Sequence, residues 1–243
     1  MVYRAVDATT GRVVAVKLLR GGPLASPAEA DWFRREARAA AALDHPHVVR
    51  VLGVGGEGAA PHYVMEYVPG GSLADALGGT PLTPAVAARL VKAVAAAVHH
   101  AHLRGVVHRD LKPGNILLGD GPDRLAAPKV SDFGMAKQAA PAATPTPTRA
   151  VLGTPEYMAP EQAFGRSAGV GPAADVYALG AVLYESLTGR PPFRGETPYD
   201  TLLQVQSLDP VPPRRLQPQV PADLETGIPH YLLTVWVGCR DSN

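Results

Sequence analysis

The segment from His108 to Asn115 gathers polar side chains whose types and spacing could carry out a reaction. Asp110 could accept or orient the proton of an attacking hydroxyl group. Lys112 offers a positive charge two residues later, and Asn115 could reach a metal ion around a tight loop. These three side chains are candidates for one reaction site.

The segment 108–115 reads HRDLKPGN and resembles the catalytic loop of the protein kinase superfamily, H-R-D-x-K-x-x-N. A polar surface turn is the alternative, and eight residues that match in type and spacing argue against it. The resemblance implies that Asp110 positions a substrate hydroxyl and that Lys112 contacts the transferring phosphoryl group. A lysine two residues after the aspartate implies the serine/threonine branch of the superfamily.

Asp132-Phe133-Gly134 follows 22 residues after Asp110. Alone this tripeptide is a weak signal, since it also marks ordinary turns. Downstream of the first motif it resembles the kinase segment whose aspartate holds Mg²⁺ against nucleotide phosphates. The resemblance therefore implies ATP and Mg²⁺ as cofactors, with Asp132 and Asn115 as the metal ligands.

The run Val14-Ala15-Val16-Lys17 resembles the kinase V-A-I-K strand. The resemblance implies that Lys17 neutralises the α- and β-phosphates of ATP. Its expected partner is Glu36, on the following helix, while Glu29 is a rival that already caps that helix. Solvated surface charges are the alternative for each residue, and the downstream motifs argue against it.

The segment Met65-Glu66-Tyr67-Val68 resembles the kinase hinge, which binds adenine through backbone groups. The resemblance places these contacts at Glu66 and Val68, with Met65 bordering the pocket. The residues expected to sandwich the adenine ring are Val2, Ala15 and Leu117.

The segment 153–161 reads GTPEYMAPE and resembles the end of the kinase activation segment. The resemblance implies that Thr154 bonds to Asp110 and Lys112 and that a protein is the substrate. Because Arg109 precedes Asp110, phosphorylation in this segment could switch the enzyme on. The candidate sites are Thr144, Thr146 and Thr148, although a merely flexible Pro/Thr loop is an equal alternative.

Asp175 resembles a buried kinase aspartate that braces the backbone of the catalytic loop, so we expect a structural role. Three histidines, His99, His100 and His102, cluster upstream of that loop. They share no helical face with a cysteine or carboxylate at ligand spacing, so we do not expect a metal site there. His45 and His47 are interpreted as parts of a turn.

The elements that must position these residues change in character after Pro69-Gly70-Gly71. Strands are predicted at 1–5, 12–19, 48–52 and 62–67, with one helix from the Ser26 cap to about Leu43. Mainly helices follow, above all at 84–104 and 172–187. We therefore predict an α+β, bilobal protein kinase fold with a partial N-lobe and hinge at 1–68, a partial C-lobe at 69–226, and a divergent tail at 227–243.

Both ends depart from the kinase pattern. Val2 matches the last position of G-x-G-x-x-G-x-V, so we expect the glycine loop and the first strand to be missing and a sheet edge to be exposed. The last helices also have no counterpart, so Glu161 is expected to lack its arginine partner. A frame shift near Thr226 is one hypothesis for this end.

Composition limits the other possibilities. The 243 residues are 46% hydrophobic and 19% charged, with a net charge of +1, which gives no reason to expect nucleic-acid or membrane-surface binding. The single cysteine, Cys239, excludes an intrachain disulfide and fits a reducing compartment. Without a visible signal peptide or membrane segment, we expect a cytoplasmic protein.

The leading functional hypothesis is ATP-dependent phosphorylation of serine or threonine residues in proteins, as part of signal transduction. Self-association for autophosphorylation is a possible further interaction. The alternatives are a non-catalytic pseudokinase-like scaffold, an inactive fragment, or a small-molecule kinase of the same fold. The alanine-, arginine- and proline-rich composition resembles bacterial, Hanks-type members of the superfamily.

Overall fold

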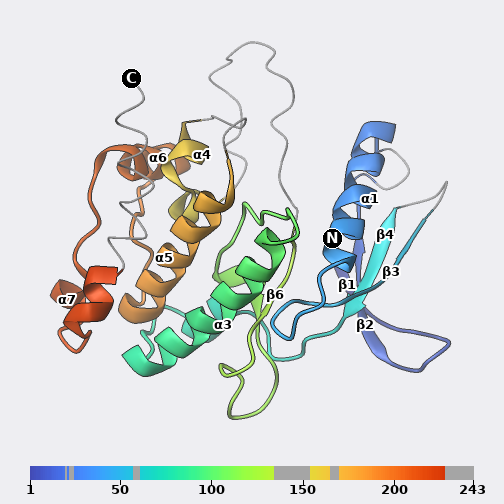
Figure 1. Ribbon diagram of the computed structural model, residues 1–243, viewed down its shortest axis with the longest axis horizontal. Helices are drawn as coiled ribbons and strands as arrows, with labels where there is room; N and C mark the ends of the chain where they lie inside the picture. The colour runs from blue at the N-terminus through green and yellow to red at the C-terminus, as the bar shows by residue number, and fades with distance from the viewer. Residues whose placement is uncertain (20, 22–24, 57–60, 134–153, 165–169, 228–243) are drawn as a thin grey trace.

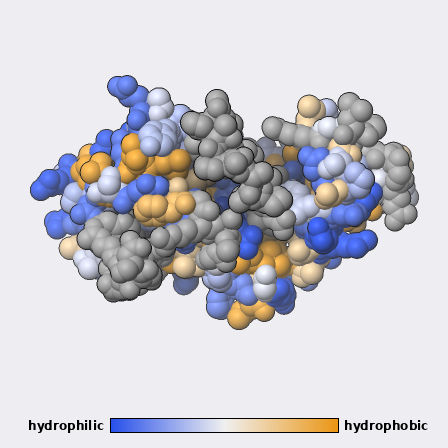
Figure 2. Space-filling model, turned by 90° about the horizontal axis from the view of Figure 1, so that it is seen from above, coloured by the Kyte–Doolittle hydropathy of each residue, from blue (hydrophilic) through white to orange (hydrophobic). Residues whose placement is uncertain are grey.

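The computed structural model describes residues 1–19, 21, 25–56, 61–133, 154–164 and 170–227. The chain forms a small lobe of four strands and one helix and a larger, mainly helical lobe, which lie side by side (Figure 1). Seen from above, hydrophilic and hydrophobic residues are interspersed over both lobes (Figure 2). This arrangement agrees with the two-part layout predicted from the sequence.

An antiparallel sheet builds the small lobe. Its strands are β1 (Val2–Val6), β2 (Val13–Leu18), β3 (Val51–Gly55) and β4 (His62–Glu66), in the order β1-β2-β4-β3. The turn between β1 and β2 is held by Asp7, whose carboxylate accepts hydrogen bonds from the Thr9 and Thr10 amides. The hairpin predicted from this turn is confirmed.

β3 begins at Val51, three residues later than the strand predicted at 48–52. The reason is that the preceding residues bond to the large lobe instead of the sheet. Val48 forms a bridge with Val130, and the Val49 amide donates to the Val130 carbonyl at 2.9 Å. This loop therefore joins the two lobes.

Helix α1 (Pro27–Ala41) covers one face of the sheet (Figure 1). It begins with the predicted capping box, in which Ser26 and Glu29 satisfy each other's backbone amides. Its buried face includes Phe33, Glu36 and Ala37, and the Phe33 ring lies 5.3 Å from the Tyr63 ring on β4. The packing of this helix therefore decides where Glu36 points.

The large lobe is built around two long helices, α3 (Pro84–His102) and α5 (Pro172–Thr188). α5 is buried along most of its length, as its apolar sequence predicts. The other elements are α2 (Leu73–Leu77), η2 (Pro113–Asn115), β5 (Ile116–Leu117), β6 (Lys129–Val130), η3 (Pro155–Tyr157), α4 (Pro160–Ala163), α6 (Pro198–Ser207) and α7 (Pro213–Leu216).

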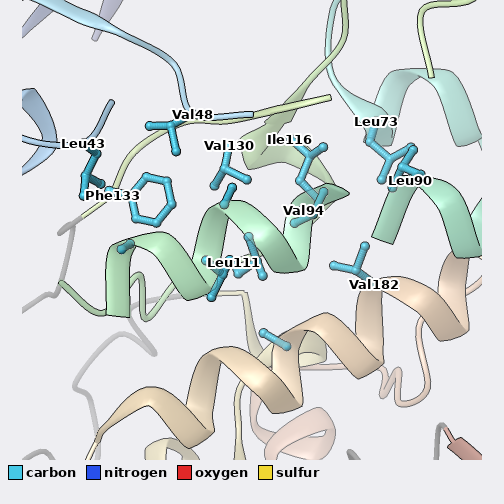
Figure 3. Packing of buried hydrophobic residues seen from close by; sticks show 14 of the residues in the cluster. Leu43, Val48, Leu73, Leu90, Val94, Leu111, Ile116, Val130, Phe133 and Val182 are labelled. Carbon is cyan, nitrogen blue, oxygen red and sulfur yellow. The ribbon is translucent and has the colours of Figure 1, made fainter. Parts of the chain in front are cut away.

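One core cluster connects the long helices to the strands that carry the candidate site. Figure 3 shows Val94 of α3 and Val182 of α5 on one side and Ile116 and Val130 of the β5–β6 pair on the other. Phe133, next to the metal-ligand candidate Asp132, packs into the same cluster and is 2% exposed. The site is therefore fixed to the most buried part of the molecule.

Strand β1 lies at one edge of the sheet and pairs only with β2 among the described strands. Its apolar side chains Val2, Tyr3 and Val6 are exposed. An exposed edge was expected at this strand, and the strand order agrees with that expectation.

Gly70 lies where the chain leaves the small lobe and crosses β5. Its amide donates to the Leu118 carbonyl at 2.9 Å, and a Cβ atom there would lie 1.8 Å from the Gly119 carbonyl oxygen. We therefore expect Gly70→Ala to lower the free energy of unfolding by about 1–3 kcal/mol, because two backbone segments must separate. Urea denaturation measures this change.

Gly119→Ala is the matched control for this crossing, since a Cβ at Gly119 would meet nothing within 4 Å. Equal stability of the Gly70→Ala and Gly119→Ala variants would contradict the close approach of these two segments.

Candidate active site

Lys112 connects two residues that lie far apart in the sequence. Its Nζ donates to Asp110 Oδ2 at 2.9 Å and to Thr154 Oγ1 at 2.8 Å. The expected contact between Thr154 and Lys112 is therefore present, while the link from Thr154 to Asp110 runs through the lysine. A carboxylate, a cation and a hydroxyl group meet at one point.

Asn115 closes the loop that carries Asp110. It lies in the 3-10 turn η2, is 8% exposed, and donates through Nδ2 to the Asp110 carbonyl at 2.7 Å and to Oδ2 at 3.3 Å. Because these bonds use the amide nitrogen, the side-chain oxygen is the atom with the chemistry of a metal ligand.

Asp175 holds the backbone of the catalytic loop, as predicted. This fully buried aspartate on α5 accepts hydrogen bonds from the amides of His108 at 2.8 Å and Arg109 at 2.7 Å. Arg109 has a φ of 64°, a left-handed conformation that is costly for an arginine and needs such support. The Gln162 side chain also donates to the Arg109 carbonyl, at 2.9 Å.

His102 is a third partner of Asp175, and sequence reasoning missed it. Its Nε2 donates to Asp175 Oδ2 at 2.7 Å, from the last turn of α3. The position of His102 on the α3 face that packs on α5 could have indicated this contact. The sequence, however, shows a cluster of three histidines, and nothing in it singles out His102.

His108 itself is fully buried beneath the loop. Its Nε2 donates to the Ser131 carbonyl at 2.9 Å, and its ring meets the Phe133 ring edge-on with centroids 4.9 Å apart. It therefore links the catalytic loop to the segment that carries Asp132.

Lys17 reaches across from the small lobe to Asp132. The Nζ–Oδ1 distance is 2.6 Å, and the lysine side chain is 7% exposed. Asp132 has a φ of 61°, a second left-handed residue at the site. This contact brings the phosphate-binding candidate and the metal-binding candidate together.

The expected ion pair between Lys17 and Glu36 is not the arrangement in this structure, and this expectation is corrected. Lys17 Nζ pairs with Asp132, whereas both Glu36 carboxylate oxygens are buried without a hydrogen-bond partner among the described residues. Burial raises the pKa of Glu36 to about 7, although the Lys17 charge opposes this shift. Asp132, and not Glu36, is therefore the carboxylate that pairs with Lys17.

The raised pKa of Glu36 gives stability a defined pH dependence. The folded protein binds a proton at Glu36 up to about pH 7, whereas an unfolded glutamate releases it near its ordinary value of 4.5. The stability that the folded protein gains by holding this proton more tightly is fully present below pH 4.5 and is lost as the pH rises through 7. We therefore expect Glu36→Gln to raise the Tm at pH 8 and to leave it almost unchanged at pH 4.5.

Thermal denaturation of both proteins across this pH range tests the expectation. Glu29→Gln is the control, because Glu29 is an exposed helix-capping residue whose pKa is lowered by its bonds to Ser26. An equal Tm difference between the parent and Glu36→Gln at both pH values would contradict a raised pKa.

The residues expected to bind adenine lie around β2 and the end of β4. Ala15 is paired with Met65 across the sheet, and both belong to one apolar cluster against which Val68 and Leu117 pack. Val2 lies opposite Lys17 in the β1–β2 register and is 52% exposed. Four of the expected adenine-binding residues are thus neighbours, Val2 lies on the adjacent strand, and Glu66 is at the end of β4.

The remaining predictions concern the phosphorylation sites, Glu161 and possible metal sites. Thr144, Thr146 and Thr148 lie outside the described residues. The Glu161 Oε2 atom is buried without a hydrogen-bond partner in the described part of the chain, and burial raises its pKa. No group of three or more His, Cys, Asp or Glu side chains that could hold a metal occurs within the described ranges.

Comparison with known proteins places this geometry in a family. The protein kinase domain matches residues 1–222. The chain belongs to the protein kinase family. It is 42% identical over 229 residues to the serine/threonine-protein kinase PknB of Mycobacterium leprae and 40% identical over 225 residues to the serine/threonine-protein kinase PrkC of Bacillus subtilis.

These alignments cover 92% of this chain but only 36% and 34% of the two relatives, so the chain spans about a third of their length. A crystal structure of Rad53 residues 1–466 with AMP-PNP is also similar, with a TM-score of 0.76 and 27% identity over 95% of this chain and 56% of that one. The α+β kinase fold with a sheet-containing small lobe and a helical large lobe is confirmed, and the two relatives named above are serine/threonine-protein kinases.

Among the helices that the structure describes, none is both long and apolar enough to cross a membrane.

Proposed function

We propose that this chain transfers the γ-phosphoryl group of ATP to serine or threonine hydroxyl groups of proteins. The observation that carries the proposal is the position of Lys112 between Asp110 and Thr154. A hydroxyl group placed beside Asp110 could donate its hydrogen bond to the carboxylate, while Lys112 would stabilise negative charge on the transferring group. Catalysis of this kind consists mainly of positioning and electrostatics.

ATP and Mg²⁺ are the proposed cofactors. Asp132 and the side-chain oxygen of Asn115 offer the hard oxygen atoms that Mg²⁺ prefers, and phosphate oxygens and water would complete its coordination. When bound, the ion would neutralise charge on the phosphates. Lys17, 2.6 Å from Asp132, would bind the same phosphates.

The remaining parts of the proposal concern the biological setting. Protein substrates are proposed because the relatives are serine/threonine-protein kinases. A cytoplasmic site of action and a role in signal transduction are further parts of the proposal. The domain limits proposed are 1–68 for the small lobe with its hinge and 69–226 for the large lobe. Phosphorylation at Thr144, Thr146 or Thr148, with Arg109 pairing to the phosphate, is the proposed means of activation.

A transfer assay tests the proposed reaction. The protein is incubated with γ-labelled ATP, Mg²⁺ and a peptide pool containing serine, threonine and tyrosine, followed by phosphoamino-acid analysis and mapping of the labelled sites. We expect label on phosphoserine and phosphothreonine. Nucleotide binding without any transfer would instead favour the scaffold, and label only on tyrosine would contradict the serine/threonine assignment.

A further inference from the structure

Strand β6 connects the two lobes through its backbone. On one side Val130 is paired with Ile116 of β5. On the other side its amide donates to the His47 carbonyl at 2.8 Å, and its carbonyl accepts from the Val49 amide at 2.9 Å. The backbone of β6 is therefore held by both lobes. A side chain on β6 that contacts the small lobe can thus fix the position of one lobe relative to the other.

The neighbouring residue on β6 makes an ion pair with the end of the small-lobe sheet. Lys129 Nζ lies 2.7 Å from Glu66 Oε1. The same oxygen accepts a hydrogen bond from the Arg50 amide at 2.8 Å, and the Glu66 amide donates to the Arg50 carbonyl at 2.9 Å. The Glu66 side chain is thus fixed between the two lobes, and its backbone has little freedom to shift.

Lys129 also lies beside the floor of the expected adenine pocket. In the β5–β6 pair it is directly opposite Leu117, the residue expected beneath the adenine ring. One lysine is therefore joined to the proposed hinge contact through its side chain and to the proposed pocket floor through its strand. The separation of the hinge from Leu117 sets how the edge of a planar base that bonds to the hinge lies over the floor of the pocket.

We propose that Lys129 is a positioning residue for nucleotide binding, which acts through Glu66 to hold the hinge at the correct distance from Leu117. The inference rests on the proposed function, since it requires adenine to occupy this pocket. It adds a residue outside the motifs that suggested the reaction. Lys129 would touch no part of the nucleotide and would act on the adenine end alone.

The expected effect is modest because the ion pair is partly exposed to solvent. The Lys129 and Glu66 side chains are 27% and 30% exposed, and such pairs contribute little in water. We expect Lys129→Met to weaken the binding of adenosine and of Mg·ATP by the same factor, about three- to fivefold. A residue that acted on the phosphates would weaken only Mg·ATP.

The experiment measures dissociation constants for adenosine and Mg·ATP by calorimetry, with the Tm recorded in the absence of ligand. Lys129→Met is compared with Lys129→Arg, which keeps the charge, and with Lys92→Met, which removes an exposed lysine on α3. Glu66→Gln removes the other charge of the pair without changing side-chain shape. In that background, Lys129→Met should have little further effect if the two residues act together.

The inference holds if Lys129→Met and Glu66→Gln weaken both ligands equally, if Lys129→Arg restores most of the affinity, and if Lys92→Met binds as the parent does. It is overturned if Lys129→Met matches Lys92→Met, or if only Mg·ATP is affected. It is also overturned if the Tm falls while both affinities stay unchanged, since the pair would then serve stability alone. An unsubstituted protein that binds neither ligand overturns the proposed function, and this inference with it.

Discussion

Asp110→Asn lowers the rate of phosphoryl transfer by about 10²–10⁴-fold, as expected for the loss of a group that accepts a proton. The substitution keeps the size and shape of the side chain, and the Asn115 bond to the backbone carbonyl of residue 110 does not depend on the carboxylate. An amide, however, cannot accept the hydroxyl proton. Initial rates of labelled phosphate transfer measure the effect, and the Tm should change little.

Asp120→Asn is the control for this substitution, because Asp120 is an exposed aspartate that follows the β5 strand. Its rate should equal that of the parent protein. An Asp110→Asn protein that transfers phosphate at the parental rate would remove Asp110 from the reaction, whatever the resemblance of its loop.

Asp175→Ala is expected to have the largest effect on stability. The substitution leaves the amides of His108 and Arg109 and the His102 ring without their acceptor in a fully buried site. Removing one member of a buried, hydrogen-bonded pair costs about 3–5 kcal/mol. Urea denaturation should show this loss in the free energy of unfolding.

Activity should fall further than the folded fraction of Asp175→Ala explains. The left-handed backbone at Arg109, with its φ of 64°, loses its support, and that backbone carries Asp110. Ser186→Ala is a matched control on the same helix, since the buried Ser186 hydroxyl has no hydrogen-bond partner among the described residues. Its stability should equal or exceed that of the parent, and an equal loss in both variants would contradict the bracing role of Asp175.

Local signals predicted much of the fold. The Ser26–Glu29 capping box places the start of α1 correctly, and Gly189, with a φ of 78°, ends α5 where expected. Such signals work because capping and turn formation involve residues close in sequence. The start of β3 was misplaced because Val49 bonds to Val130, a partner 81 residues away that no local pattern reveals.

In the candidate site, too, contacts between residues close in sequence were predictable and contacts between distant residues were not. The spacing within the catalytic loop was sufficient to relate Asp110, Lys112 and Asn115, since all three lie within six residues. The partner of Lys17 could not be decided in this way. Glu36 and Asp132 are both carboxylates within reach of the small-lobe lysine, and only the three-dimensional arrangement shows that Asp132 lies at 2.6 Å.

His102 and Lys129 illustrate a further limit. Each acts through a residue from a different element, Asp175 in one case and Glu66 in the other. Neither residue belongs to a short motif, and each has an ordinary explanation as a surface side chain. Contacts of this kind follow from helix and strand packing, so they become visible only in the assembled fold.

We propose that residues of both lobes form one Mg·ATP site, and calorimetric titration is the direct test. The protein is titrated with ATP in the presence and absence of Mg²⁺, and the titrations are repeated with Asp132→Asn. We expect Mg²⁺ to strengthen ATP binding to the parent protein and Asp132→Asn to lose this gain. ATP binding that is absent, or that is equally strong with and without Mg²⁺, would contradict this proposal.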